Sequence, residues 1–100
     1  MKALLGSVAA LALLATGAAQ AQDDPIKIGF MATLEGTYTV LGEDGLRGFR
    51  LALMEANDEA GGRKIEYVIG PTDASPDSAV RAARKLIEQD QVDFIIGPLS

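Results

Sequence analysis

The sequence predicts an α/β fold in which a parallel sheet is flanked by helices. Two observations support this prediction. Three short apolar segments have the composition and partial alternation of strands, and they cover residues 26–31, 64–69 and 92–96. Two segments with helical periodicity lie between them, and each connection is long enough for a crossover. The order strand, helix, strand, helix, strand is typical of parallel sheets with helices on their faces.

The first helix is expected from about Leu46 to Ala60. Its apolar residues recur at steps of three and four, at positions 46, 49, 53, 56 and 60. Asp44 is a candidate N-terminal cap, since residues 32–44 are expected to form a loop. The pair Gly61-Gly62 is expected to end the helix, because glycine accepts the left-handed conformation that follows a last turn.

The second helix has a clear start. Ser75 is the expected cap, Pro76 suits the first helical position, and Asp77 places a negative charge in the first turn. Residues 70–74 are expected to be a loop. The third strand is expected to end at Gly97-Pro98.

Residues 1–21 are predicted to be a cleavable secretory signal peptide. Lys2 precedes an apolar run of 13 residues, from Ala3 to Ala15, and the small residues of Ala19-Gln20-Ala21 suit a signal peptidase. A membrane anchor is the alternative, but a spanning helix needs about 18 or more apolar residues. The mature protein is expected to begin at Gln22. The chain has no cysteine, so we expect a free periplasmic protein rather than a lipoprotein.

Composition excludes several classes of function. With no cysteine and no histidine, the chain lacks the usual zinc ligands and the usual catalytic thiol or imidazole. Residues 22–100 carry 8 basic and 14 acidic side chains, a net charge of −6, without a basic run. Nucleic-acid binding is not expected, since phosphate contacts need clustered Lys and Arg. We expect no cofactor, no metal and no enzymatic activity.

A ligand site is predicted at one edge of the sheet. In open α/β sheets, ligands bind beyond the carboxyl ends of the strands, where the strand order reverses. With the strand order 2-1-3, that point lies between the first and third strands. Two segments meet there, residues 32–44 and residues 97–100. The first offers glycines, threonines and Tyr38, and the second ends at Ser100, where the free amides of a following helix would suit a carboxylate.

Other residues near this point have two interpretations each. Tyr38 either stacks on a ligand or packs on the surface. Glu35, Glu43 and Asp44 are either acid or base groups, or solvated and capping residues. Asp73 is interpreted as structural.

The spacing of Gly42, Gly45 and Gly48, three residues apart, does not fit a dinucleotide fingerprint, and no phosphate loop is present. Gly45 and Gly48 are expected to let the first helix approach the sheet.

The arrangement of these motifs resembles the amino-terminal lobe of type I periplasmic solute-binding proteins. Within that class it is similar to the group that binds branched-chain amino acids (Leu/Ile/Val) and related ligands for ABC importers. The stretches that carry the resemblance are Pro25 to Gly29, Gly36, Leu41-Gly42, Gly48, Ala52, Glu55 to Asn57, Gly61-Gly62, Asp73, Ser75-Pro76, Leu86-Ile87 and Val92 to Ser100.

The resemblance implies two α/β lobes that close on one small ligand and deliver it to an inner-membrane ABC permease, with the full-length protein a monomer. Ser100 matches a serine that commonly touches the ligand carboxylate. The loop that includes Leu34 and Tyr38 lines the cleft, and Leu41 falls where leucine binders have a pocket aromatic.

Two residues depart from the pattern of that group. Leu41 is not aromatic, and Glu35 stands where a small polar residue is common. Aromatic acids, amides and urea-like ligands therefore remain open beside amino acids. Two other functions also remain open, a ligand-sensing receptor of the same fold and an exported flavodoxin-like enzyme. Because the pattern stops directly after a strand, we expect residues 22–100 to be the first part of a longer lobe.

Overall fold

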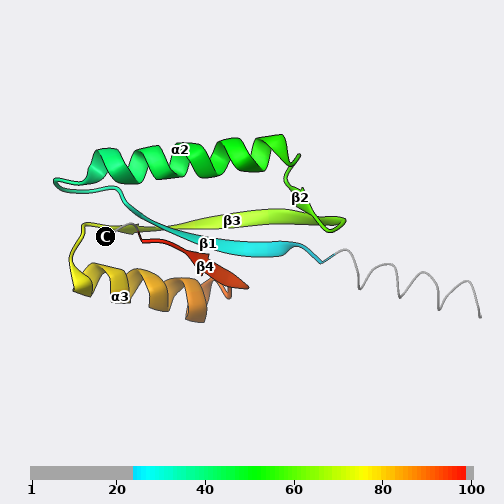
Figure 1. Cartoon of the computed structure of the whole chain (residues 1–100). Coiled ribbons are helices and arrows are strands. Elements are labelled where there is room, and N and C mark those ends of the chain that lie inside the picture. Colours follow the sequence, from blue (N-terminus) through cyan, green and yellow to red (C-terminus); the bar gives the residue numbers. More distant parts are fainter. Residues whose placement is uncertain (1–23, 99–100) are drawn as a thin grey trace, which may run out of the picture.

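The computed structural model of the chain describes residues 24–98, so the predicted signal peptide and Ser100 lie outside the described residues. In chain order the elements are β1 (Ile26–Thr33), α2 (Thr39–Glu55), β2 (Glu59–Ala60), β3 (Arg63–Thr72), α3 (Pro76–Arg84), a π-helical turn η1 (Lys85–Gln89) and β4 (Phe94–Ile96). The sheet has the order β2-β3-β1-β4, with α2 and α3 on opposite faces (Figure 1).

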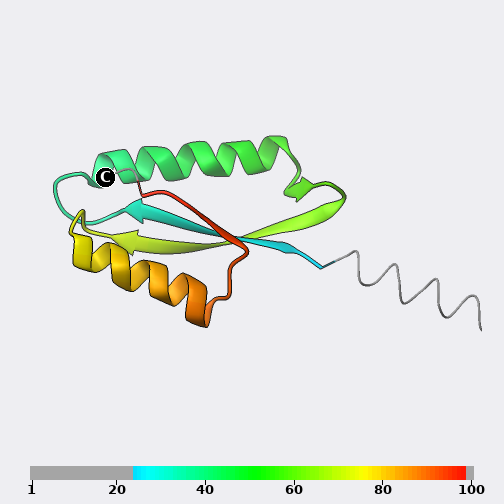
Figure 2. The ribbon, with the colours of Figure 1, turned by 60° about the horizontal axis from the view of Figure 1, so that its bottom comes forward.

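The predicted α/β class and the order of the three parallel strands are confirmed. Central β1 pairs with β3 over its whole length, from Ile26↔Ile65 to Thr33↔Thr72, and with β4 around Gly29↔Ile95. After β1 the chain crosses to β3 on one side, and it then crosses back over β1 to β4 on the other side. Right-handed crossovers in these two opposite directions require helices on opposite faces, as Figure 2 shows.

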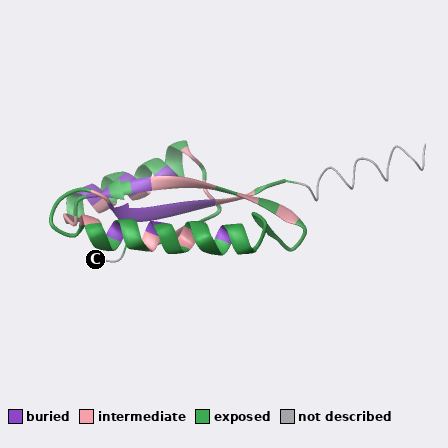
Figure 3. Ribbon diagram, turned by 90° about the horizontal axis from the view of Figure 1, so that it is seen from above, coloured by how far each residue is buried: buried purple, intermediate pink, exposed green. Residues whose placement is uncertain are grey.

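Alternating side chains of β1 supply both layers of the core. Phe30 and Ala32 pack with Leu46 under α2, whereas Met31 packs with Ala82 and Leu86 under α3. The strand is therefore apolar on both faces, as expected for a strand covered by helices on both sides. Figure 3 shows burial concentrated in this strand, with exposed residues along the outer face of α2.

The start of α2 differs from the prediction. The helix begins at Thr39 with Tyr38 as the N-cap residue, so residues 39–44 are helical rather than loop, and Asp44 forms an ion pair with Arg47 instead of capping. The loop is shorter because Gly36 adopts a left-handed φ of 85°, and the Thr39 hydroxyl donates to the Gly36 carbonyl at 2.7 Å. These contacts turn the chain within a few residues.

The end of α2 also differs. The helix ends at Glu55, and Asn57 and Asp58 follow with φ values of 57° and 54°. Glu59–Ala60 then pairs antiparallel with the start of β3, so that Gly61 and Gly62 form a two-residue turn. Their φ values of 58° and 78° suit such a hairpin turn. The two glycines therefore close a hairpin and do not end the helix.

Gly42 lets α2 approach the sheet, whereas Gly45 and Gly48 were expected to do so, and the expectation for Gly45 stays a prediction. A Cβ atom at Gly42 would lie 1.6 Å from the Thr33 carbonyl oxygen, whereas a Cβ at Gly48 would meet nothing within 4 Å. The expectation for Gly48 is therefore wrong, because this residue lies on the exposed face of the helix. Among residues 24–98, no helix has the length and apolar character needed to cross a bilayer.

The predicted cap of α3 is confirmed. Ser75 accepts a hydrogen bond from the Ser78 amide at 3.2 Å, and Pro76 occupies the first turn. The two neighbouring strands differ in length from the prediction. β3 continues to Thr72, through part of the expected loop, and β4 is limited to Phe94–Ile96.

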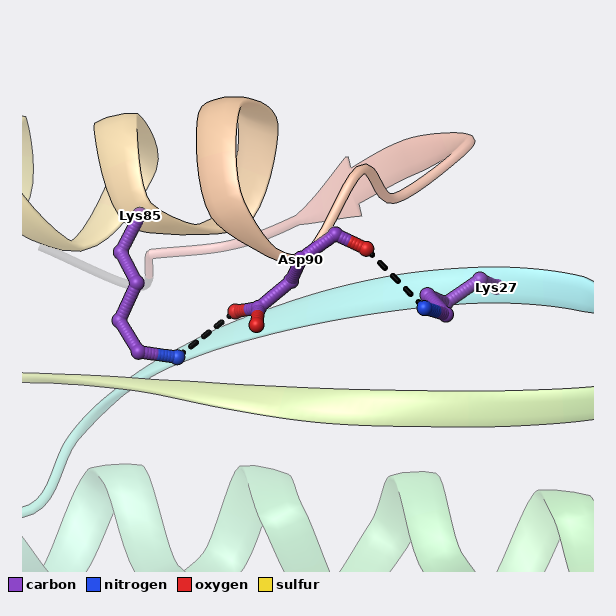
Figure 4. Close-up of polar contacts among 3 residues, drawn as sticks. All are labelled: Lys27, Lys85 and Asp90. Atoms are coloured by element: carbon purple, nitrogen blue, oxygen red, sulfur yellow. Dashed lines mark hydrogen bonds and ion pairs between the residues drawn. The ribbon is translucent and has the colours of Figure 1, made fainter.

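A polar network fixes the turn between η1 and β4. Lys85 Nζ lies 2.7 Å from Asp90 Oδ2, and Lys27 Nζ of β1 donates to the Asp90 carbonyl at 3.1 Å (Figure 4). The Asp93 amide also donates to the Lys27 carbonyl at 2.7 Å. These bonds join the α3–β4 connection to β1 and hold β4 beside β1.

Candidate functional site

The carboxyl ends of β1 and β4 lie side by side, as the predicted site requires. Gly97, directly after β4, is so close to β1 that a Cβ atom there would lie 2.3 Å from the Met31 carbonyl oxygen. Gly97 also has a φ of 89°, a conformation that favours glycine. The segment after β4 therefore leaves the sheet next to the loop that follows β1.

That loop, residues 34–38, is attached to the sheet at its first residue. The Leu34 amide donates to the Thr72 carbonyl at 3.0 Å, and the Thr33 and Thr72 hydroxyl oxygens lie 3.1 Å apart. Thr33 and Thr72 are only 2% and 4% exposed. The loop consequently starts from a buried polar contact rather than from a free strand end.

The three predicted contact residues within the described part of the chain occupy different environments. Tyr38 is the N-cap residue of α2 and Leu41 lies in its first turn, and they are 50% and 53% exposed. Leu34 is half-buried and packs against the core cluster of Phe30 and Leu46. Tyr38 and Leu41 thus present apolar surface at this edge, and Leu34 presents only part of its side chain.

Hydrogen-bond donors at this edge come mainly from the backbone. The hydroxyls of Thr33 and Thr39 form hydrogen bonds within the chain, to Thr72 and Gly36, which leaves Thr37 as the exposed threonine of the loop. Tyr38 forms no side-chain cap at the start of α2. The Thr39 and Leu41 amides also donate within the chain, to the Gly36 carbonyl at 3.3 Å and the Tyr38 carbonyl at 3.1 Å. Among the described residues, the Val40 amide is therefore the first-turn donor left for a ligand, at the positive end of the helix dipole.

The acidic candidates do not form a cluster at this edge. Glu35 is in the loop, whereas Glu43 and Asp44 lie on α2, and all three are exposed. Within the described part of the chain, no group of three potential ligands could hold a metal ion. The pattern favours solvated carboxylates over acid or base groups.

An open hollow of about 250 Å³ lies at the end of β3, on the α3 side of the sheet. Its lining residues are Glu35, Gly70, Pro71, Thr72, Asp73, Ser78, Arg81, Ala82 and Lys85. It does not include Leu34, Tyr38 or Leu41, so it is distinct from the predicted site. We do not include it in the candidate site, because Asp73 and Ser78 bond to each other in the turn into α3 and Lys85 pairs with Asp90 outside the hollow.

Asp73 illustrates those internal bonds. Hydrogen bonds from the side chain and backbone of Ser75 hold the pKa of Asp73 at about 2, and the Ser75 amide lies 2.9 Å from Asp73 Oδ1. The Asp73 amide in turn donates to the Ser78 hydroxyl at 3.1 Å. Asp73 therefore organises the turn into α3, in agreement with its interpretation as a structural residue.

Sequence reasoning missed Thr72 and Gly42, which define the geometry of this edge. Thr72 was not recognised as a strand residue, because Gly70 and Pro71 suggest a loop. A usable signal existed, since a threonine lies two or three residues beyond the predicted end of each of these two strands, at positions 33 and 72.

The fold and the position of this edge are those of the α/β binding-protein class. A family model described as periplasmic binding protein matches residues 25–100. The chain belongs to this family.

Proteins of similar sequence and similar structure support this family assignment. The Leu/Ile/Val-binding protein homolog 7 of Brucella abortus strain 2308 is 36% identical over 92 residues, which are 90% of this chain and 23% of that protein. An ABC transporter substrate-binding protein from Sphaerobacter thermophilus is 43% identical, with a TM-score of 0.68 over 72% of this chain and 19% of that one.

Two further solved structures contain ligands. A solute-binding protein of an ABC transporter from Rhodopseudomonas palustris, in complex with benzoate, is 33% identical, with a TM-score of 0.68 over 73% of this chain and 20% of that one. A branched-chain amino acid transporter substrate-binding protein from Streptococcus pneumoniae, in complex with isoleucine, is 28% identical, with a TM-score of 0.69 over 75% and 22%. The chain thus spans about a fifth of the length of these relatives.

Proposed function

We propose that the protein is the periplasmic substrate-binding component of an ABC importer and that this chain contributes one wall of its ligand cleft. The observation that carries the proposal is the meeting of the segments after β1 and β4 at the switch point of the sheet, beside the first turn of α2. This is the position at which open α/β sheets bind small ligands.

The proposed ligand class is a small molecule with a carboxylate or amide next to an apolar body. Isoleucine and benzoate, the ligands of two related structures, share this chemistry. The edge offers matching groups, namely the Val40 amide at the start of α2 for the polar end and the exposed side chains of Tyr38 and Leu41 for the apolar end. Neutral donors also avoid the cost of burying an unpaired cation in a closed cleft.

Calorimetric titration of the complete natural protein tests the ligand class. The panel contains leucine, isoleucine, benzoate, 4-hydroxybenzoate and benzamide, with benzyl alcohol as the control that retains the ring and lacks the carboxylate. At least one carboxylate or amide should bind, and benzyl alcohol should not. If no carboxylate or amide binds, or if benzyl alcohol binds equally well, the proposed ligand class is wrong.

Export and delivery to an inner-membrane permease belong to the same proposal. The motivating features are the apolar run and the Ala19-Gln20-Ala21 site, together with the family. Mass spectrometry of the periplasmic fraction should find a free protein that begins at Gln22. A product that retains residues 1–15 in the membrane fraction would contradict export by cleavage. Loss of uptake of the identified ligand on deletion of the adjacent permease gene would test delivery.

A further inference from the structure

Thr33 is held from both faces of the sheet at the point where the chain leaves β1. On the α2 face, Gly42 packs against its backbone, with no room for a Cβ atom. On the α3 face, its hydroxyl meets the Thr72 hydroxyl at 3.1 Å. The two threonines are directly opposite in the parallel register, and both are almost completely buried.

This double contact determines where the following loop begins. Leu34 is the first loop residue, and its amide donates to the Thr72 carbonyl at 3.0 Å. Five residues later α2 begins, and Gly42 returns the helix to the Thr33 backbone. One end of the loop is therefore tied to Thr72 and the helix that follows it packs on Thr33. The loop contains Tyr38, a proposed ligand contact.

We propose that Thr72 is a positioning residue, which acts through Thr33 and Leu34 to fix residues 34–38 for ligand binding. The inference rests on the proposed function for its ligand, and on the geometry alone for the loop. A loop that is ordered before binding loses less conformational entropy in the complex, and this raises affinity. Thr72 itself does not need to touch the ligand.

The test compares variants of the complete natural protein. Thr72→Val keeps the shape of the side chain and removes its hydroxyl, whereas Thr72→Ser keeps the hydroxyl. Tyr67→Phe is the matched control, because it removes from the middle of β3 a hydroxyl that accepts from Arg50 at 3.0 Å. Affinity for the best ligand of the panel is measured by calorimetry well below the unfolding temperature, and exchange of the Leu34 amide is measured by NMR.

Thr72→Val should weaken binding by about three- to tenfold, the scale of one net hydrogen bond. It should accelerate exchange at Leu34 more than at amides near the Gly29↔Val68 pair. Thr72→Ser and Tyr67→Phe should resemble the wild type in both measurements. Unchanged affinity in Thr72→Val, or equal losses in Thr72→Val and Tyr67→Phe, would overturn the proposal.

A second variant tests the proposal in case Thr72→Val does not fold. Thr33→Val combined with Thr72→Val replaces both hydroxyls by methyl groups, which avoids a buried unpaired polar atom. It should fold and still show fast exchange at Leu34, and slow exchange there would contradict the positioning role. If the wild type binds nothing in the panel, the proposed ligand class fails, and the Leu34 exchange of these variants alone decides whether the threonine pair fixes the loop.

Discussion

Gly42 of α2 touches the backbone of Thr33 at the end of β1, and a Cβ atom on Gly42 would stand 1.6 Å from the Thr33 carbonyl oxygen. Helix and strand can approach this closely only when a side chain is absent. The contact matters because the first turn of α2 and the end of β1 border the candidate ligand site.

Gly42→Ala should therefore be strongly destabilising. The added methyl group would push α2 away from β1, at a cost of about 2 kcal/mol or more, even though alanine favours helices. Chemical denaturation measures the free energy of unfolding. The control is Gly48→Ala in the same helix, where nothing lies within 4 Å, and this change should stabilise by about 0.5–1 kcal/mol. Equal effects of the two substitutions would refute the close contact.

The carboxylate of Asp73 should make the protein sensitive to acid. Its pKa is lowered from 3.8 to about 2 by hydrogen bonds from Ser75. A group whose pKa is depressed in the folded state stabilises that state at pH values above its unfolded pKa, and this stabilisation disappears as the pH falls from about 4 to about 2.

Asp73→Asn should lower stability at neutral pH and flatten the dependence of stability on pH between about 4 and 2. Denaturation at a series of pH values measures both effects. Glu66→Gln removes a charge from an exposed position of β3 and provides the control. An acid dependence in Asp73→Asn that matches the wild type would show that other groups cause it.

The sequence was sufficient for the strand order, since the alternation of strand and helix patterns leaves few topologies when crossovers are right-handed. It was insufficient for the ends of α2. Ala56 and Ala60 continue the helical spacing, but both are exposed, and the left-handed residues Asn57 and Asp58 have already ended the helix. Periodicity detects which residues face a core, and it does not detect where backbone hydrogen bonds stop.

The candidate site was predictable in position and less so in detail. A switch point follows from strand order alone, so the two segments that meet there were identified, and their role in ligand binding stays a prediction. The threonines of the first loop were expected to bind ligand, yet Thr33 and Thr39 hydrogen-bond within the chain. Which partner a hydroxyl selects depends on contacts between residues distant in sequence, such as Thr33 and Thr72, and local patterns do not contain that information.

Tyr38 should contribute to ligand binding and little to stability. Half of its surface is exposed at the candidate edge, so a ligand that covers part of it gains apolar contact. Tyr38→Ala should weaken binding by about 1–2 kcal/mol, roughly five- to thirtyfold. Leu51→Ala is the control, because Leu51 is 53% exposed on the same helix, about three and a half turns away. Calorimetry with the best ligand should find Leu51→Ala unchanged, and losses of the same size in both variants would remove Tyr38 from the site.

Ser100 is the last predicted contact, and in the sequence it comes four residues after the end of β4 at Ile96. A serine hydroxyl there would donate to the ligand carboxylate, and the loss of one hydrogen bond to a charged group costs about 1.5–3 kcal/mol. Ser100→Ala in the complete natural protein should therefore weaken binding of a carboxylate ligand by about tenfold to a hundredfold. The unfolding temperature of the unliganded protein should barely change.

A neutral analogue separates this role of Ser100 from a general change in the cleft. Hydrogen bonds between neutral groups contribute only about 0.5–1.5 kcal/mol, so Ser100→Ala should reduce the affinity for the amide form of the ligand less than the affinity for its carboxylate form. Titration of both forms into wild type and variant gives the comparison. Unchanged affinity for the carboxylate would exclude Ser100 from the site. An equal loss for the two forms would instead show that the serine shapes the cleft without bonding to the charged end, and the carboxylate would then depend on backbone donors such as the Val40 amide at the start of α2.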